Sequence, residues 1–193
     1  MRYADLVATS TAVAATTSRT DKVGLLAELL RQVPPDEVGI GVGHLSGVRP
    51  QRRLGVGYRT LAQLAVTAAA ESTLSLAEVD AAFTGLAAAA GPGSAATRRD
   101  LLTGLLSRAT EPEQRFLRDV ITGNLRQGAL DGVMLPAIAT AYSLPQHVVR
   151  RAAMLAGFAA PVADRRPSKR PVLASPPCPN GRRGLPWRPT SST

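Results

Sequence analysis

The chain has 193 residues and a formal net charge of +9, from 23 lysines and arginines against 14 aspartates and glutamates. Its single cysteine, Cys178, permits no intramolecular disulfide and no cysteine-rich zinc site, and its two histidines, His44 and His147, are far apart in sequence. No apolar run reaches the roughly 18–20 residues of a membrane span, and the N-terminal segment is not typical of a signal peptide. These features favour a cytoplasmic protein without a metal cluster.

The first 160 residues are rich in alanine and leucine, the strongest helix formers, and poor in aromatic residues. Capping-box pairs, with a hydroxyl residue three positions before an acid or amide, occur at Ser75/Glu78, Thr110/Glu113 and Ser143/Gln146, with Ser18/Asp21 as a weaker variant. Apolar residues follow these caps at helical spacing. The pattern predicts an all-α fold with helices over residues 3–15, 19–32, 36–46, 59–71, 76–90, 95–108, 111–123, 130–142 and 145–157.

Residues 161–193 have a different composition. They contain 8 of the 15 prolines and carry 7 basic residues against 1 acidic residue, whereas residues 1–160 carry 16 against 13. Proline interrupts helices, and the segment has little apolar surface to offset chain entropy. We therefore predict a helical domain over 1–160 and a disordered, basic, Arg/Pro-rich tail over 161–193. An out-of-frame reading of a GC-rich gene and an ordinary basic linker both fit the composition of this tail.

An internal repeat emerges when the sequence is shifted by 76 residues. The leucine pairs that begin at Leu25 and Leu29 then align with those that begin at Leu101 and Leu105. Glu37 meets Glu113 and Gly47 meets Gly123 in the same register, which a chance match of two amphipathic helices would not give. The repeat predicts two similar helical halves, joined by helices near residues 59–90.

A glycine and a cluster of polar or basic residues follow the same helix in each half. Gly47 precedes Arg49, Arg52 and Arg53, and Gly123 precedes Asn124, Arg126 and Gly128. Such glycines commonly serve as left-handed helix caps, which is one interpretation. A glycine turn also presents unobstructed backbone N–H groups, and arginine offers a fork that matches phosphate. On this second interpretation, the two clusters grip two stretches of a nucleic-acid backbone.

Several segments carry a family resemblance. They are Thr17-Ser18-Arg19-x-x-Lys22, Leu45-Ser46-Gly47 with Leu54-Gly55-Val56-Gly57, Gly91-Pro92-Gly93-Ser94 followed by Arg98, and Glu113 to Gly128 with Gly123-Asn124-Leu125-Arg126 at its centre. Over residues 1–157 the sequence resembles the N-terminal DNA-binding domain of bacterial, in particular actinobacterial, ATP-dependent DNA ligases. Arg98 stands where the family pattern has lysine, and Arg118 lies one place from the family arginine in the simplest alignment.

The resemblance implies a monomeric module that grips the backbone of nicked duplex DNA for strand joining in replication, repair and recombination. The DNA-binding residues it implies, together with the basic clusters, are Arg19, Lys22, Arg52, Arg53, Ser94, Arg98, Arg118, Gly123, Asn124, Arg126 and Gly128. Family members continue into an adenylation domain with a K-x-D-G lysine, but neither Lys22 nor Lys169 stands in that motif. We therefore expect a truncated ligase with no catalytic or metal-binding residue and no bound cofactor, ATP and Mg²⁺ being implied for the full-length enzyme.

An alternative is a non-enzymatic helical adaptor that binds another protein through its leucine and alanine faces. The arginines would then be solvated surface residues. On either interpretation we expect ordinary roles for the two histidines. Aromatic residues make up only 4% of the chain, so stacking on single-stranded nucleic acid is a poor explanation. Salt dependence separates the two functions, because binding to a DNA backbone weakens steeply with salt and apolar protein contact does not.

Overall fold

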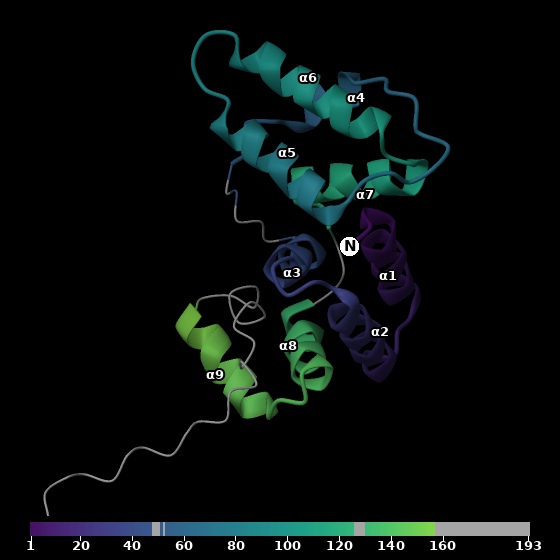
Figure 1. Cartoon of the computed structure of the whole chain (residues 1–193), viewed down its shortest axis with the longest axis vertical. Coiled ribbons are helices and arrows are strands. Elements are labelled where there is room, and N and C mark those ends of the chain that lie inside the picture. Colours follow the sequence, from purple (N-terminus) through teal and green to yellow (C-terminus); the bar gives the residue numbers. More distant parts are fainter. Residues whose placement is uncertain (48–50, 52, 126–129, 157–193) are drawn as a thin grey trace, which may run out of the picture.

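The structure, a computed structural model, describes residues 1–47, 51, 53–125 and 130–156 (Figure 1). These residues form helices without a β-strand, so the predicted all-α class is confirmed for the described part of the chain. The helices are α1 (Tyr3–Ala15), α2 (Arg19–Gln32), α3 (Val38–Ser46), α4 (Tyr58–Gln63), α5 (Leu76–Ala88), α6 (Ser94–Ser107), α7 (Glu111–Thr122), α8 (Leu130–Ala141) and α9 (Gln146–Ala156). None of these described helices combines the length and apolar character needed to cross a bilayer. The predicted tail over 161–193 lies outside the described residues.

Capping by a hydroxyl side chain explains the starts of α2, α5 and α7. The Ser75 hydroxyl accepts a hydrogen bond from the Glu78 amide (3.2 Å), and the Glu78 carboxylate accepts one from the Ser75 amide (2.8 Å). Thr110 forms the same kind of capping box at α7. Ser143 does not form one, because it adopts a left-handed conformation (φ 53°) three residues before α9 begins. The capping box predicted for Ser143 is therefore wrong, although the helix that follows it is present.

The predicted helix over 59–71 is the largest error in the helix assignment. Helix α4 ends at Gln63, and an irregular segment leads from it to α5. Side chains of α7 bind carbonyl groups of this segment: the Gln114 side-chain amide donates to Val66 O at 3.3 Å, and Arg118 Nη2 donates to Leu64 O at 3.2 Å. Because these carbonyls have partners from a distant helix, the segment does not need its own helical hydrogen bonds. The other predicted helix bounds lie within two residues of the observed ones.

The repeat is visible in the order and packing of the helices. Helices α1–α4 and α5–α8 follow one another at nearly the offset of the sequence repeat. Helix α1 packs on α2 as α5 packs on α6, and α1 contacts α7 as α3 contacts α5. Residues 59–90 are therefore not a connector between the halves, since α4 corresponds to α8 and α5 to α1. In Figure 1, α4–α7 lie above α2, α3, α8 and α9, and α1 lies beside both groups.

Aromatic residues from both halves meet in the core. Tyr3, His44, Phe83 and Phe116 come from α1, α3, α5 and α7, and each is at least 94% buried. The Tyr3 hydroxyl lies 3.2 Å from His44 Nδ1, and the His44 ring stacks on Phe83 with centroids 5.2 Å apart. Burial raises the pKa of the Tyr3 phenol well above its usual value, and the Glu113 carboxylate raises it further. His44 thus has the structural role that the sequence analysis gave it.

Candidate nucleic-acid interface

The two glycine turns that close the repeats lie against each other. Gly47 ends α3 with φ 68° and Gly123 ends α7 with φ 73°, both in the left-handed conformation that favours glycine. The Asn124 backbone N–H donates to Asp119 O at 2.9 Å, so the turn after α7 provides a partner for a carbonyl at the helix end. A Cβ placed on Gly47 would lie 3.7 Å from Leu125 Cβ. The turns are helix caps, as one interpretation predicted, and they also bring the ends of the two halves together.

The turn at Gly123 is open to solvent. Gly123 and Asn124 are both exposed, and a Cβ placed on Gly123 would have nothing within 4 Å. Packing within the domain therefore does not require the missing side chain; only the backbone conformation does. The open space leaves room for a polyanion to approach the backbone N–H groups of this turn. Arg126 and Gly128, which the sequence assigned to the same turn, lie outside the described residues.

The start of α2 meets the start of α8. Ser18 caps α2, accepting a hydrogen bond from the Asp21 amide at 3.3 Å. Arg19, which is exposed, donates from Nη2 to the carbonyl of Gly132 in α8 at 2.7 Å. Lys22 is half-buried one turn further along α2. Arg19 of the first half therefore contacts the first turn of α8 in the second half.

The segment after Gly47 crosses onto the second half. The Gln51 amide donates to Asp80 Oδ1 at 2.9 Å and to Thr84 Oγ1 at 3.0 Å, both on α5. Arg53 is exposed, and Leu54 next to it is buried with 4% of its surface accessible. Arg52 lies outside the described residues. Sequence reasoning missed Gln51 and its partners, and the spacing of Asp80 and Thr84 on one helix face is the only signal that pointed to them.

Arg98 directs its guanidinium toward the protein. Its Nε donates to Leu86 O at 3.3 Å and its Nη2 donates to Ala89 O, both at the end of α5. Its Nη1 donates to the Ser94 hydroxyl at 3.3 Å. These carbonyls have no helical amide partner, and a cation at a helix C-terminus is favoured by the helix dipole. Ser94 and Arg98, both predicted to bind DNA, are thus joined in a cap on α5.

Arg118 binds a helix end in the same way. From α7 it donates to Leu61 O at 2.5 Å and to Leu64 O at 3.2 Å, at the end of α4. The side chain is half-buried. Gly123 follows Arg118 by little more than one helical turn, but Arg118 points into the junction between α7 and α4. The structure thus leaves Arg53, Gly123 and Asn124 exposed, whereas Ser94, Arg98 and Arg118 are engaged with the protein. Arg19 is exposed and also donates a hydrogen bond to Gly132 O.

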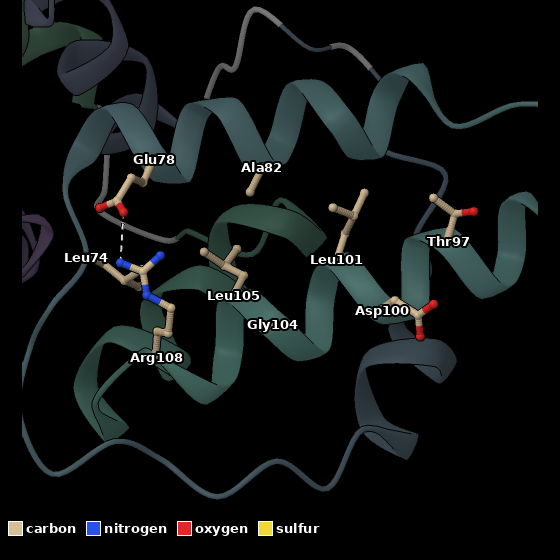
Figure 2. Close-up of a pocket in the computed structure, with 9 residues that line it drawn as sticks. All are labelled: Leu74, Glu78, Ala82, Thr97, Asp100, Leu101, Gly104, Leu105 and Arg108. Atoms are coloured by element: carbon tan, nitrogen blue, oxygen red, sulfur yellow. Dashed lines mark hydrogen bonds and ion pairs between the residues drawn. The ribbon is translucent and has the colours of Figure 1, made fainter.

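A groove of about 570 Å³ lies between α5 and α6, and no residue of the predicted interface lines it. Figure 2 shows Glu78 and Arg108 paired across one end of the groove and Asp100 at the other, with Leu101 and Leu105 between them. The Glu78–Arg108 ion pair measures 2.8 Å. Hydrogen bonds from Arg108 and Ser75 lower the pKa of Glu78 to about 2. The Glu78–Arg108 pair is therefore a surface contact across the groove, and the Glu78 carboxylate stays ionised at neutral pH.

The fold is therefore a helical domain of two interlocked halves, with exposed basic and glycine segments where the halves meet. Residues 66–139 match the family model described as DNA ligase N terminus. This match lies across the second half, from the segment before α5 to within α8.

Most of the chain is also similar to curated proteins named "Probable DNA ligase". It is 50% identical to the one from Anaeromyxobacter sp. (strain K) over 167 residues, which cover 85% of this chain and 33% of that protein. It is 50% identical to the one from Nocardia farcinica over 157 residues, covering 81% and 30%. It is 48% identical to the one from Streptomyces griseus over 163 residues, covering 84% and 32%.

These findings confirm the resemblance to the N-terminal part of DNA ligases. The chain spans about a third of the length of the curated relatives it matches.

Proposed function

We propose that this chain is the DNA-binding part of an ATP-dependent DNA ligase and grips the backbone of nicked duplex DNA. The observation that carries the proposal is the meeting of the two repeat-closing turns at Gly47 and Leu125. In the sequence, each turn is followed by an exposed polar or basic residue, Arg53 in one half and Asn124 in the other. The family match and the names of the relatives support DNA as the partner.

In this proposal the two halves contact two stretches of phosphates. Arg53 and Arg19 supply guanidinium groups, which pair with phosphate oxygens through charge-assisted hydrogen bonds. Lys22 adds a positive charge beside Arg19, and the Gly123–Asn124 turn supplies backbone N–H groups without a side chain in the way. Arg52, Arg126 and Gly128 belong to the same two segments in the sequence and complete the proposed contact set. Recognition through phosphates is independent of base sequence.

We do not assign the nick-sealing chemistry to this chain. The resemblance implies that a ligase lysine is adenylated with ATP and Mg²⁺, that AMP is transferred to a 5′-phosphate, and that the 3′-hydroxyl seals the nick. We propose that this domain holds the DNA as a monomer while other domains carry out those steps. Ser94, Arg98 and Arg118 would support the grip indirectly. Arg98 and Arg118 bind carbonyls at helix ends, and the Ser94 hydroxyl accepts a hydrogen bond from Arg98. Replication, repair and recombination are the processes that need such joining.

Binding of a fluorescent duplex tests the proposal. We expect the affinity for nicked duplex to fall steeply with salt, because each phosphate contact releases a counterion. Arg53→Ala should reduce the slope of log affinity against log salt by about one. The matched control is Arg31→Ala, which also removes one arginine but from the far end of α2, where Arg31 pairs with Glu28 at 2.9 Å.

Two results would contradict the proposal. One is binding that does not change with salt, which would favour the protein-adaptor alternative. The other is an Arg53→Ala variant whose salt slope matches that of Arg31→Ala. Comparing a nicked duplex with an intact duplex of the same sequence tests the preference for nicks separately.

A further inference from the structure

The segment that carries Arg53 is attached to the opposite half of the domain on both sides of that residue. On one side, the Gln51 amide binds Asp80 and Thr84 of α5 at 2.9 and 3.0 Å. On the other side, Leu54 is buried in the core and Gly55 adopts a left-handed conformation with φ 66°. Arg53 itself remains exposed. An exposed arginine beside such attachments has fewer backbone conformations than an arginine on a free loop.

Arg98 forms the second attachment through its contact with Gly55. A Cβ placed on Gly55 would lie 2.6 Å from Arg98 Nε, 2.7 Å from its Cζ and 2.9 Å from its Nη2. The guanidinium therefore lies directly over the Gly55 backbone and leaves no room for a side chain there. The same guanidinium donates hydrogen bonds to the carbonyls of Leu86 and Ala89. The end of α5, Arg98 and Gly55 thus form a continuous stack.

We propose that Arg98 and Gln51 are positioning residues that preorganise Arg53 for contact with a DNA phosphate; this inference rests on the proposed function. Arg98 acts through its contact with the Gly55 backbone, and Gln51 acts through α5. Both attachments connect a segment of the first half to helices of the second half. Preorganisation raises affinity because the ordering of the segment has already taken place before DNA binds.

The alternative role for Arg98 is a direct phosphate contact, and a lysine substitution separates the two. Arg98→Lys retains the positive charge but loses the planar fork that spans Leu86 O and Ala89 O. Positioning predicts that Arg98→Lys weakens duplex binding about tenfold, the scale of one lost charge-assisted hydrogen bond. A direct phosphate contact predicts that Arg98→Lys binds nearly as well as the wild-type chain.

The decisive experiment is a double-mutant cycle with Arg53→Ala, measured on the full chain with a nicked duplex. If Arg98 acts through Arg53, Arg98→Lys and Arg98→Met should each cost little further affinity in the Arg53→Ala background. The salt slope of Arg53→Ala/Arg98→Met should then be about one unit below that of the wild-type chain, because one phosphate contact is lost. Additive losses of affinity, or a slope about two units lower, would overturn the inference.

Asp80→Ala/Thr84→Val tests the other attachment without changing any arginine. It removes both acceptors of Gln51, and we expect the same loss of affinity and the same coupling to Arg53→Ala. All measurements are made well below the melting temperature of each variant, so a role limited to overall stability would leave affinity unchanged and refute positioning. If the wild-type chain itself shows no salt-dependent duplex binding, the proposed function fails. If the wild-type chain binds and the cycle is additive, only the positioning role fails.

Discussion

Arg118→Met gives a sharp test of whether the Arg118 guanidinium is structural. The substitution removes two hydrogen bonds, to Leu61 O at 2.5 Å and to Leu64 O at 3.2 Å. A hydrogen bond from a charged group contributes about 1.5–3 kcal/mol, and the half-burial of the side chain places the pair toward the lower end. Helix α4 has only six residues and cannot persist without such contacts. We expect the free energy of unfolding to fall by roughly 2–4 kcal/mol.

The control for this variant lies three residues earlier on the same helix. Arg115 pairs with Glu111 at 2.9 Å, and its side chain is 71% exposed. Arg115→Met should therefore cost at most about 0.5 kcal/mol. The melting temperature, measured by circular dichroism, should fall by roughly 5–15 °C in Arg118→Met. In Arg115→Met it should stay nearly unchanged. Equal melting temperatures for the two variants would refute the structural role of Arg118.

Three further changes test other parts of the structure. Gly104→Ala should stabilise the domain by about 0.5–1 kcal/mol in chemical denaturation, because Gly104 lies inside α6 and an added Cβ would meet nothing within 4 Å; a loss of stability would contradict this. Glu113→Gln should cost about 1–3 kcal/mol, because this buried carboxylate accepts from the Ser72 hydroxyl at 2.7 Å and from the Thr110 amide at 2.8 Å; an unchanged denaturation midpoint would show that the network contributes nothing. The pKa of Glu78 is about 2 in the folded chain against 4.5 for a free carboxyl, so its stabilising contribution is complete above about pH 4.5 and is lost as the pH falls toward 2. Glu78→Gln should accordingly flatten the melting-temperature curve between pH 5 and pH 2, and a curve that keeps its wild-type shape would rule this out.

The sequence predicted helices well where their signals are local. Ser75 and Thr110 cap helices with residues three positions away, so the start of each helix is written in a short stretch of chain. The structure of the region after Gln63, by contrast, depends on contacts with residues far away in the sequence. Gln114 and Arg118 bind its carbonyls from α7, at sequence separations of 48 and 54 residues. Helix propensity alone extended α4 too far, because tertiary contacts override it.

The candidate site shows the same division between local and distant causes. The glycine turns were predicted because their caps are local and because the repeat places Gly47 and Gly123 in register. The partners of Arg98 and Arg118 were not predicted, since an arginine fork fits a phosphate and a pair of carbonyls equally well. Gln51 was missed because Asp80 and Thr84 lie 29 and 33 residues away. The sequence thus located the two glycine turns but not the contacts that Gln51, Arg98 and Arg118 make.

Gly123 provides the test that separates a helix cap from a site of close DNA approach. Its φ of 73° is left-handed, and an added Cβ would meet nothing within 4 Å. Gly123→Ala should therefore cost only the backbone strain, about 1–2 kcal/mol. Gly123→Asn should cost less, because asparagine adopts this conformation more readily.

If Gly123 is only a cap, Gly123→Asn should keep wild-type affinity for nicked duplex, and any effect of Gly123→Ala should follow its stability alone. If DNA approaches the backbone closely at this turn, both side chains occupy that space, and both variants should bind at least several-fold more weakly at temperatures where each is fully folded. Affinity measured beside thermal unfolding distinguishes the two. Because the Cβ has no neighbour within 4 Å among the described residues, steric repacking of that part of the domain does not explain a loss of affinity in the asparagine variant. Unchanged affinity in both variants would mean that the backbone at Gly123 does not approach DNA, and the proposed grip would then depend on Arg53 and Arg19 without this turn.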